Sequence, residues 1–327
     1  MFNKRVFKVL AIFIVFVFLF SFNIVHAENI LTEEEFFQYE SENLIIRYFN
    51  LQIENKEEIQ RDSDTPIKSG DAILITTPEG QNILIDSGIN YTGENLNQYL
   101  NEIGVEKLDY AFATHPHWDH IGGFLTLFNT IEIDQLYHVN VPNDTSTYAE
   151  YLELIERNNI ENEYIEAGNT LEIEKDIKFE VLNPPAGTSP ENLPPVEDIS
   201  TRQINNESLV MNFSFNDISF LIIGDIYRDR EVDLTEIYDN DELEANILHA
   251  PHHGEETGSS FELIEAVNPD YTVISRDELA SISIFNRYRS YDIEVFVTGL
   301  NGHILLESDG YDINIFTEEV IDSPFLH

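Results

Sequence analysis

The residues best suited to chemistry are three histidines and an aspartate within six consecutive positions, in the run THPHWDHIGG that begins at Thr114. Imidazole nitrogen and carboxylate oxygen are ligands that zinc and manganese accept. On a turn just past a strand, His115 and His117 can point to one side. Asp119 and His120 can then reach a second point nearby. The run therefore predicts a metal site.

Three further segments place acidic residues or histidines at the ends of apolar strands. They are NILIDSG from Asn82, FLIIGD from Phe220 and APHHG from Ala250. Together with the histidine run they resemble, in the same order and over about 170 residues, the motifs of the metallo-β-lactamase superfamily of binuclear metallohydrolases. That resemblance implies a four-layer αββα sandwich, an α/β (α+β) fold.

The resemblance also implies two divalent metal ions, zinc or manganese. Matched residue by residue, the implied ligands are His115, His117, Asp119, His120, Asp225 and His253. The first two would hold the first metal, Asp225 would bridge, and the other three would hold the second. Two such ions about 3.5–4 Å apart can share a water and lower its pKa from near 16 towards 7. That water would attack phosphorus or a carbonyl carbon, so no protein nucleophile is required.

Four residues have expected roles around these ligands. Asp86 ends a buried strand and is expected to orient the histidine run through hydrogen bonds. Asp119 and His252 are the candidate catalytic residues; for His252 the alternatives are a substrate phosphate contact, a general acid, or a structural neighbour of His253. His249, where the family commonly has lysine, either packs in the core or orients a ligand.

The subgroup is indicated by Gly70-Asp71-Ala72, by NNESLV from Asn205 and by the Pro-His-His-Gly sequence. These are similar to the hydrolase domain of ComEC competence proteins and to phosphorylcholine esterases of bacterial surfaces, over roughly residues 44–316. Two departures matter. A charged insertion at 52–68 precedes Gly70, and His138 is the one histidine between the histidine run and Asp225. The second departure argues against a β-lactam substrate.

The first 27 residues are typical of a secretory signal. Lys4, Arg5 and Lys8 form a charged start, residues 9–20 an apolar run, and Val25-His26-Ala27 a small-residue cleavage site. The alternative is an uncleaved N-terminal membrane anchor. The chain has no cysteine, which excludes lipoprotein anchoring, disulfides and thiolate ligands.

The charge balance is strongly acidic, with 17 basic and 61 acidic residues and a net charge of −44. Removal of the signal takes three basic residues away, so the mature charge becomes 14 − 61 = −47. Such a field repels free polyanions and is unlike that of a nucleic-acid binder. It suits solvation in a salty or alkaline exterior, while two divalent metals would still make the site locally positive.

Hydrophobic patterning predicts an acidic segment at 28–43 with a short helix at 33–39, then one hydrolase domain at 44–327. Helices are expected at 96–103, 122–128, 148–157 and 261–267, and a long loop at 184–203. Strands are expected at 44–49, 72–76, 83–86, 108–113, 135–141, 208–215, 218–223, 245–249, 271–275, 294–298, 303–307 and 311–316, with a hairpin at 171–182.

The function expected from these features is a secreted metal-dependent hydrolase that cleaves a phosphoester, in particular a phosphodiester, of a small or surface-attached substrate. An extracellular nuclease of the ComEC type is the alternative within that class, disfavoured by the charge. A non-catalytic surface-binding protein on the same fold is the alternative outside it. No stable membrane partner is expected beyond the possible N-terminal anchor.

Overall fold

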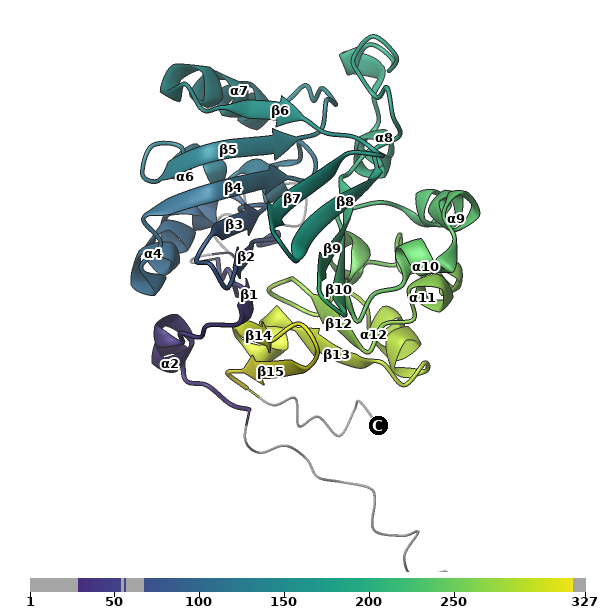
Figure 1. Ribbon diagram of the computed structural model, residues 1–327. Coiled ribbons are helices and arrows are strands. Elements are labelled where there is room, and N and C mark those ends of the chain that lie inside the picture. The colour runs from purple at the N-terminus through teal and green to yellow at the C-terminus, as the bar shows by residue number, and fades with distance from the viewer. Residues whose placement is uncertain (1–28, 54–55, 57–67, 320–327) are drawn as a thin grey trace, which may run out of the picture.

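The computed structural model describes residues 29–53, 56 and 68–319 (Figure 1). Within them, two mixed β-sheets pack face to face. The first has the strand order β15 (Ile313–Thr317), β14 (Ile304–Ser308), β1 (Leu44–Tyr48), β2 (Ile73–Thr76), β3 (Asn82–Ile85), β4 (Lys107–Ala113), β5 (Glu132–His138) and β6 (Asn162–Tyr164). The second has the order β13 (Glu294–Val297), β12 (Tyr271–Ile274), β11 (Ile247–His249), β10 (Ile218–Ile223), β9 (Val210–Phe215), β8 (Ile177–Asn183) and β7 (Thr170–Glu174).

Alternation along the strands builds one core between the sheets and another on each outer face. In β2, Ile73 and Ile75 face the core between the sheets, whereas Leu74 faces outward. Phe220 and Leu221 of β10 divide in the same way between the inner core and the second outer core. Strands buried on both faces read as continuous apolar runs, which is the pattern seen here.

Helices cover both outer faces, so the four layers predicted from the sequence are confirmed (Figure 1). On the first sheet they are α2 (Glu33–Gln38), α4 (Gly93–Ile103), α6 (Phe124–Leu127) and α7 (Ser146–Asn158). On the second they are α9 (Arg228–Ile237), α10 (Asn240–Leu243), α11 (Phe261–Val267) and α12 (Ile282–Arg289). Phe36 and Phe37 of α2 are buried in the outer core of the first sheet, so the acidic N-terminal segment packs onto the domain.

Several expected boundaries are wrong. The helix expected at 122–128 is α6, which spans only four residues, and a separate short helix, α5 (Trp118–Ile121), precedes it. The strand expected at 135–141 is β5, which begins at Glu132, and the loop expected at 184–203 contains a 3-10 turn at Val196–Asp198 and the start of α8 (Thr201–Asn206). The sequence pattern did not anticipate β6, α9, α10 or α12.

Strand direction decides where the polar motifs meet. β3 and β4 run parallel, and so do β10 and β11. Parallel neighbours end at the same edge of their sheet, where open α/β sheets bind ligands. Asp86, His115, Asp225 and His249 therefore come together from two sheets.

Among the described residues, no helix is long and apolar enough to cross a bilayer. The expected signal at 1–27 and most of the charged insertion at 52–68 (residues 54–55 and 57–67) lie outside the described residues. Both remain predictions from the sequence.

Candidate metal centre

The histidine run turns sharply between β4 and α5 and is held in place by Asp86. Asp86 has a left-handed backbone (φ 56°) and accepts two hydrogen bonds from Thr114, from its N–H at 2.8 Å and its hydroxyl at 2.7 Å. The other side of the turn is fixed by Gly123, where a Cβ would lie 2.0 Å from the carbonyl oxygen of Ser87. The ring of His120 completes the anchor, with Nδ1 2.7 Å from Asp86 Oδ2.

A second turn after β11 carries two adjacent histidines in an unusual backbone conformation. His252 (φ 51°, ψ 45°), His253 (φ 52°, ψ 31°) and Gly254 (φ 71°) are all left-handed. Each such non-glycine residue costs about 1–3 kcal/mol and persists where the surroundings hold it in place. The backbone N–H of His252 donates to Gly224 O at 3.2 Å, which ties this turn to the end of β10. The turn thereby presents both imidazoles to Asp225.

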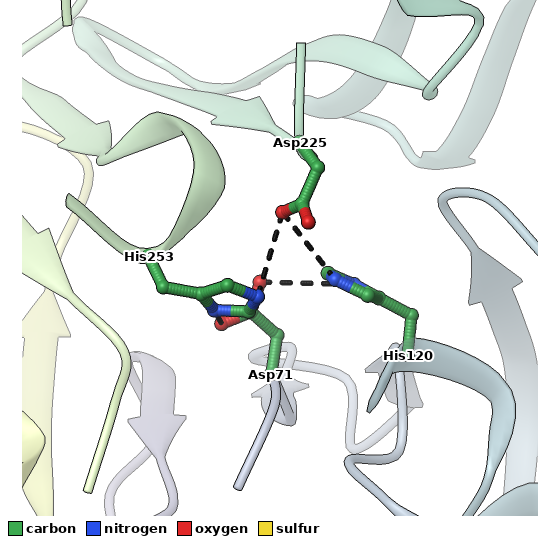
Figure 2. A group of neighbouring side chains, drawn as sticks. All are labelled: Asp71, His120, Asp225 and His253. Carbon is green, nitrogen blue, oxygen red and sulfur yellow. Dashed lines mark hydrogen bonds and ion pairs between the residues drawn. The ribbon is translucent and has the colours of Figure 1, made fainter. Parts of the chain in front are cut away.

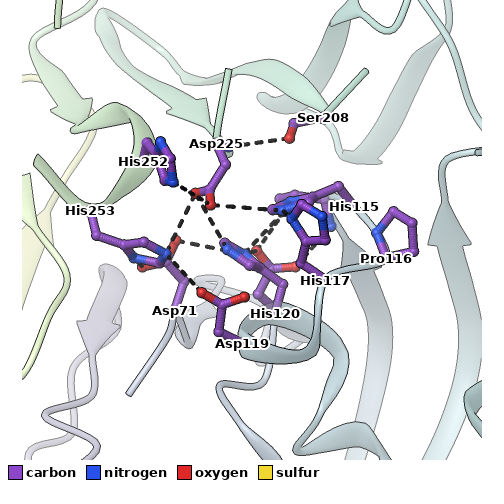
Figure 3. A network of polar contacts seen from close by, with 12 residues as sticks. Asp71, His115, Pro116, His117, Asp119, His120, Ser208, Asp225, His252 and His253 are labelled. Atoms are coloured by element: carbon purple, nitrogen blue, oxygen red, sulfur yellow. Dashed lines mark hydrogen bonds and ion pairs between the residues drawn. The ribbon is translucent and has the colours of Figure 1, made fainter. Parts of the chain in front are cut away.

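Asp225 lies at the centre, and its two carboxylate oxygens face different histidines (Figure 3). Oδ1 is 3.3 Å from His120 Nε2 and 3.5 Å from His253 Nε2. Oδ2 is 3.8 Å from His115 Nε2 and 3.5 Å from His252 Nε2. We call His120 and His253 the inner group, and His115, His117 and His252 the outer group.

A carboxylate contacts Nδ1 of each inner histidine: Asp71 for His253 (Figure 2), and Asp86 for His120. His253 Nδ1 lies 3.1 Å from both Asp71 Oδ1 and the carbonyl oxygen of Ser275. Because a carbonyl only accepts, Nδ1 of His253 carries a hydrogen, and Nε2 is the nitrogen that faces Asp225 and could bind a metal ion. In His120, Nδ1 lies against Asp86, and Nε2 likewise faces Asp225. Asp71 lies on the Nδ1 side of these rings, so its place is that of an orienting partner.

The outer histidines are supported by hydroxyl groups instead. His115 Nδ1 lies 3.1 Å from the Thr114 hydroxyl, and His115 Nε2 is 2.9 Å from His117 Nδ1. His252 Nδ1 lies 2.6 Å from the Thr257 hydroxyl, and its ring stacks on Tyr227 at 5.1 Å. Since His252 faces the same oxygen of Asp225 as His115 does, its position favours a ligand role over the substrate contact considered from the sequence.

The donor set fits divalent metal ions. Ligand atoms about 2 Å from one tetrahedral zinc ion lie about 3.3 Å apart, close to the N···O separations around Asp225. Several buried atoms of the cluster have no hydrogen-bond partner among the described residues: Asp71 Oδ2, His120 Nε2, Asp225 Oδ1 and His253 Nε2. Unpaired buried acceptors are costly unless a cation binds them. Two overlapping groups, Asp71-His120-Asp225-His253 and His115-His117-Asp225, have the spacing of metal sites.

The two groups of histidines differ in proton affinity. Burial acts against the charged form of His253, but Asp71 and Asp225 outweigh it and raise its pKa to about 9. The pKa of His120 is likewise raised, by Asp225 and Asp86, against its burial. Burial lowers the pKa of His117 to about 4 and also lowers that of His252. Carboxylate support therefore makes the inner nitrogens the more basic ones.

Asp119 is held by a lysine that sequence analysis assigned to the charged insertion. Lys68 Nζ is 2.9 Å from Asp119 Oδ2 and 3.7 Å from Asp225 Oδ2, while Asp119 Oδ2 is 3.6 Å from His253 Nε2. Nothing in the sequence pattern marked Lys68. Asp71 was also missed as a site residue, although a carboxylate between a glycine and a buried strand is the kind of signal that marked Asp86.

The remaining described histidines, His249, His138 and His303, do not contact Asp225. His249 is buried behind the inner group, with Nε2 3.4 Å from Asp71 Oδ2, so it contacts an orienting carboxylate rather than Asp225. His138 lies against Asn162 and Tyr151, away from the centre. His303 packs among aromatic rings beneath α2.

Sequence comparisons point to one superfamily. The family model of the metallo-β-lactamase superfamily matches residues 66–276, more than half of the chain. The chain is 25% identical over 264 residues to ComE operon protein 3 of Bacillus subtilis (strain 168), covering 73% of this chain and 32% of that protein. It is 26% identical over 241 residues to competence protein ComA of Neisseria gonorrhoeae, covering 71% and 30%. The chain thus spans about a third of the length of these curated relatives.

The similarity extends to solved structures. A long form RNase Z from yeast matches with a TM-score of 0.52 at 12% identity, covering 86% of this chain and 51% of that one, which bears on the fold alone. The two competence proteins are similar to this chain, as the motifs suggested for the ComEC type. From the family match, the two facing sheets and the histidine–aspartate cluster at their shared edge, we conclude that this chain belongs to the metallo-β-lactamase superfamily.

Proposed function

We propose that this superfamily hydrolase is a secreted phosphodiesterase that uses two divalent metal ions, zinc in the first instance and manganese as the alternative. The observation that carries the proposal is the arrangement around Asp225, whose two oxygens each face a different pair of imidazole nitrogens. One shared carboxylate between two donor groups suits a binuclear centre. When bound, such ions activate water and offset the negative charge that develops on phosphoryl oxygen.

The chain's own residues have separable tasks in this proposal. Asp225 joins the two halves of the centre, and Asp86 and Asp71 hold the imidazoles of His120 and His253 with Nε2 facing inward. His117 is partly exposed and marks the open side of the outer group. The half-buried ring of Tyr227 stacks on His252 of the outer group and is a candidate surface for the substrate.

The substrate class is proposed from charge and from the subgroup. ComEC-type resemblance supports a phosphodiester, and on its own would support a nuclease. A body of net charge −44 repels polynucleotides, whereas a small or zwitterionic diester, such as a choline-bearing one, is hardly affected. Small or surface-attached phosphodiesters are therefore our proposed substrates, and secretion follows from the signal-like pattern at 1–27.

The test compares a small phosphodiester with long DNA at matched metal loading, with salt varied from about 0.01 M to 1 M. Over that range the Debye length shrinks from about 30 to 3 Å. Turnover of the small diester should depend only weakly on salt and exceed that of DNA at the lowest salt. DNA cleavage, where present, should rise steeply with salt as repulsion is screened.

Two outcomes would overturn parts of this proposal. Efficient cleavage of long DNA at the lowest salt would restore the nuclease alternative. Fewer than about half an equivalent of metal after reconstitution, measured by elemental analysis, would remove the binuclear centre and favour a binding protein on this fold.

A further inference from the structure

Among the ion pairs of the described residues, Lys68 is the one lysine or arginine that pairs with a proposed metal ligand. Its ammonium lies 2.9 Å from Asp119 Oδ2 and 3.7 Å from Asp225 Oδ2. Its side chain is 14% exposed, so it lies at the boundary between the buried centre and solvent. A cation at this place adds to the charge that any ligand of the centre meets.

The backbone next to Lys68 is held in place by close packing and by hydrogen bonds. Gly70 has φ 76°, and a Cβ there would lie 1.7 Å from the carbonyl oxygen of Asp119, so this segment lies directly against the histidine run. The carbonyl of Ser69 accepts from Ile89 N at 3.1 Å, and that of Asp71 accepts from Gly88 N at 2.6 Å. The backbone just before β2 is therefore held in place by hydrogen bonds and close packing, and it positions the ammonium of Lys68 at the centre.

Two arginines near the centre, Arg276 and Arg202, are instead paired with carboxylates that are not proposed metal ligands. Arg276 binds Glu255 at 2.8 Å, and Arg202 binds Asp229 at 2.9 Å. Lys68 differs because its partners, Asp119 and Asp225, are carboxylates that bound metal ions would neutralise. Glu255, a further carboxylate that acts electrostatically on Lys68, is the one that Arg276 holds. Metal binding thus leaves the charge of Lys68 available to an incoming anion.

We propose that Lys68 binds a non-bridging phosphoryl oxygen of the substrate beside the metal centre. The inference rests on the proposed function and deepens it, because it gives the acidic molecule a local preference for a phosphoryl group. An ammonium is a compact donor of up to three hydrogen bonds and suits a phosphoryl oxygen as a point charge. Its contact would favour anionic esters over neutral ones.

The test uses the metal-loaded full chain with Lys68→Met and Lys68→Gln, and Lys56→Met as the matched control. Lys56 pairs with Asp277 and Glu278, so its loss removes the same charge without touching the ligand carboxylates. Inorganic phosphate binding is measured by calorimetry, metal content by elemental analysis, and turnover with bis(p-nitrophenyl) phosphate and the neutral ester p-nitrophenyl acetate.

Both Lys68 variants should bind phosphate about tenfold more weakly, a loss of about 1.4 kcal/mol, and show a raised KM for the phosphodiester. Metal content and activity on the neutral ester should stay at the wild-type level, and Lys56→Met should match wild type throughout. Unchanged phosphate binding in both variants would overturn the inference, and so would a gain of metal, which would mean that the ammonium competes with a metal ion. A wild type that neither binds phosphate nor cleaves the diester would overturn the proposed function itself.

Discussion

The inner and outer groups of histidines face the two different oxygens of the Asp225 carboxylate, but the groups that support their rings differ. His120 and His253 are fully buried, and each has a carboxylate behind its Nδ1. His115 and His252 have threonine hydroxyls behind theirs, and His117 is partly exposed. A carboxylate behind an imidazole fixes its tautomer and makes its free nitrogen a stronger ligand. The comparison teaches that the two halves of the centre should bind metal with unequal affinity.

The largest effect is expected from Asp225→Ala, because this residue is common to both groups. Its loss leaves two cations without their shared anion at short range, where their repulsion is strongest. Metal content should fall from about two equivalents to less than about one half. Activity should fall more than about a hundredfold, the upper end of what loss of an orienting partner costs. A variant that keeps both metals would show that the two groups do not depend on Asp225.

The asymmetry itself is tested by paired substitutions, His253→Ala in the inner group and His117→Ala in the outer group. His117→Ala should keep about one tightly bound equivalent, because the inner donors and their carboxylates remain. His253→Ala should weaken retention of the tightly bound ion. Stepwise chelator titration followed by elemental analysis gives both values. Equal losses in the two variants would contradict the asymmetry.

The smallest effects concern residues behind the ligands. Asp71→Asn keeps an acceptor for His253 Nδ1 but removes the charge that raises the pKa of His253 to about 9. Affinity of the inner position should drop about 10–100-fold. His249→Ala, which touches only Asp71 in this network, should lower it by no more than about a few fold. If His249→Ala loses as much metal as Asp225→Ala, then His249 is itself a ligand.

Much of the fold was accessible from the sequence because its strands are strongly patterned. The limits of β10 and α11 were predicted without error, and the four layers follow from strand-rich halves with interspersed helices. α9 was missed because only Glu231 and Leu234 among its residues are buried, which leaves almost no apolar stripe to detect. The close packing of Gly122 and Gly123 against Ile89 and Ser87 is a contact that local spacing does not encode.

The sequence by itself determined which residues could bind metal, because histidines and carboxylates at strand ends have few other reasons to occur in that order. Tertiary structure decided how they are grouped. Asp71 and Lys68 precede β2, far in sequence from their partners Asp119, Asp225 and His253, and only sheet packing brings them within reach. Tertiary structure also decides which histidines face each of the two oxygens of Asp225. Residue type limits the chemistry, whereas the direction of each lone pair depends on contacts made across the whole fold.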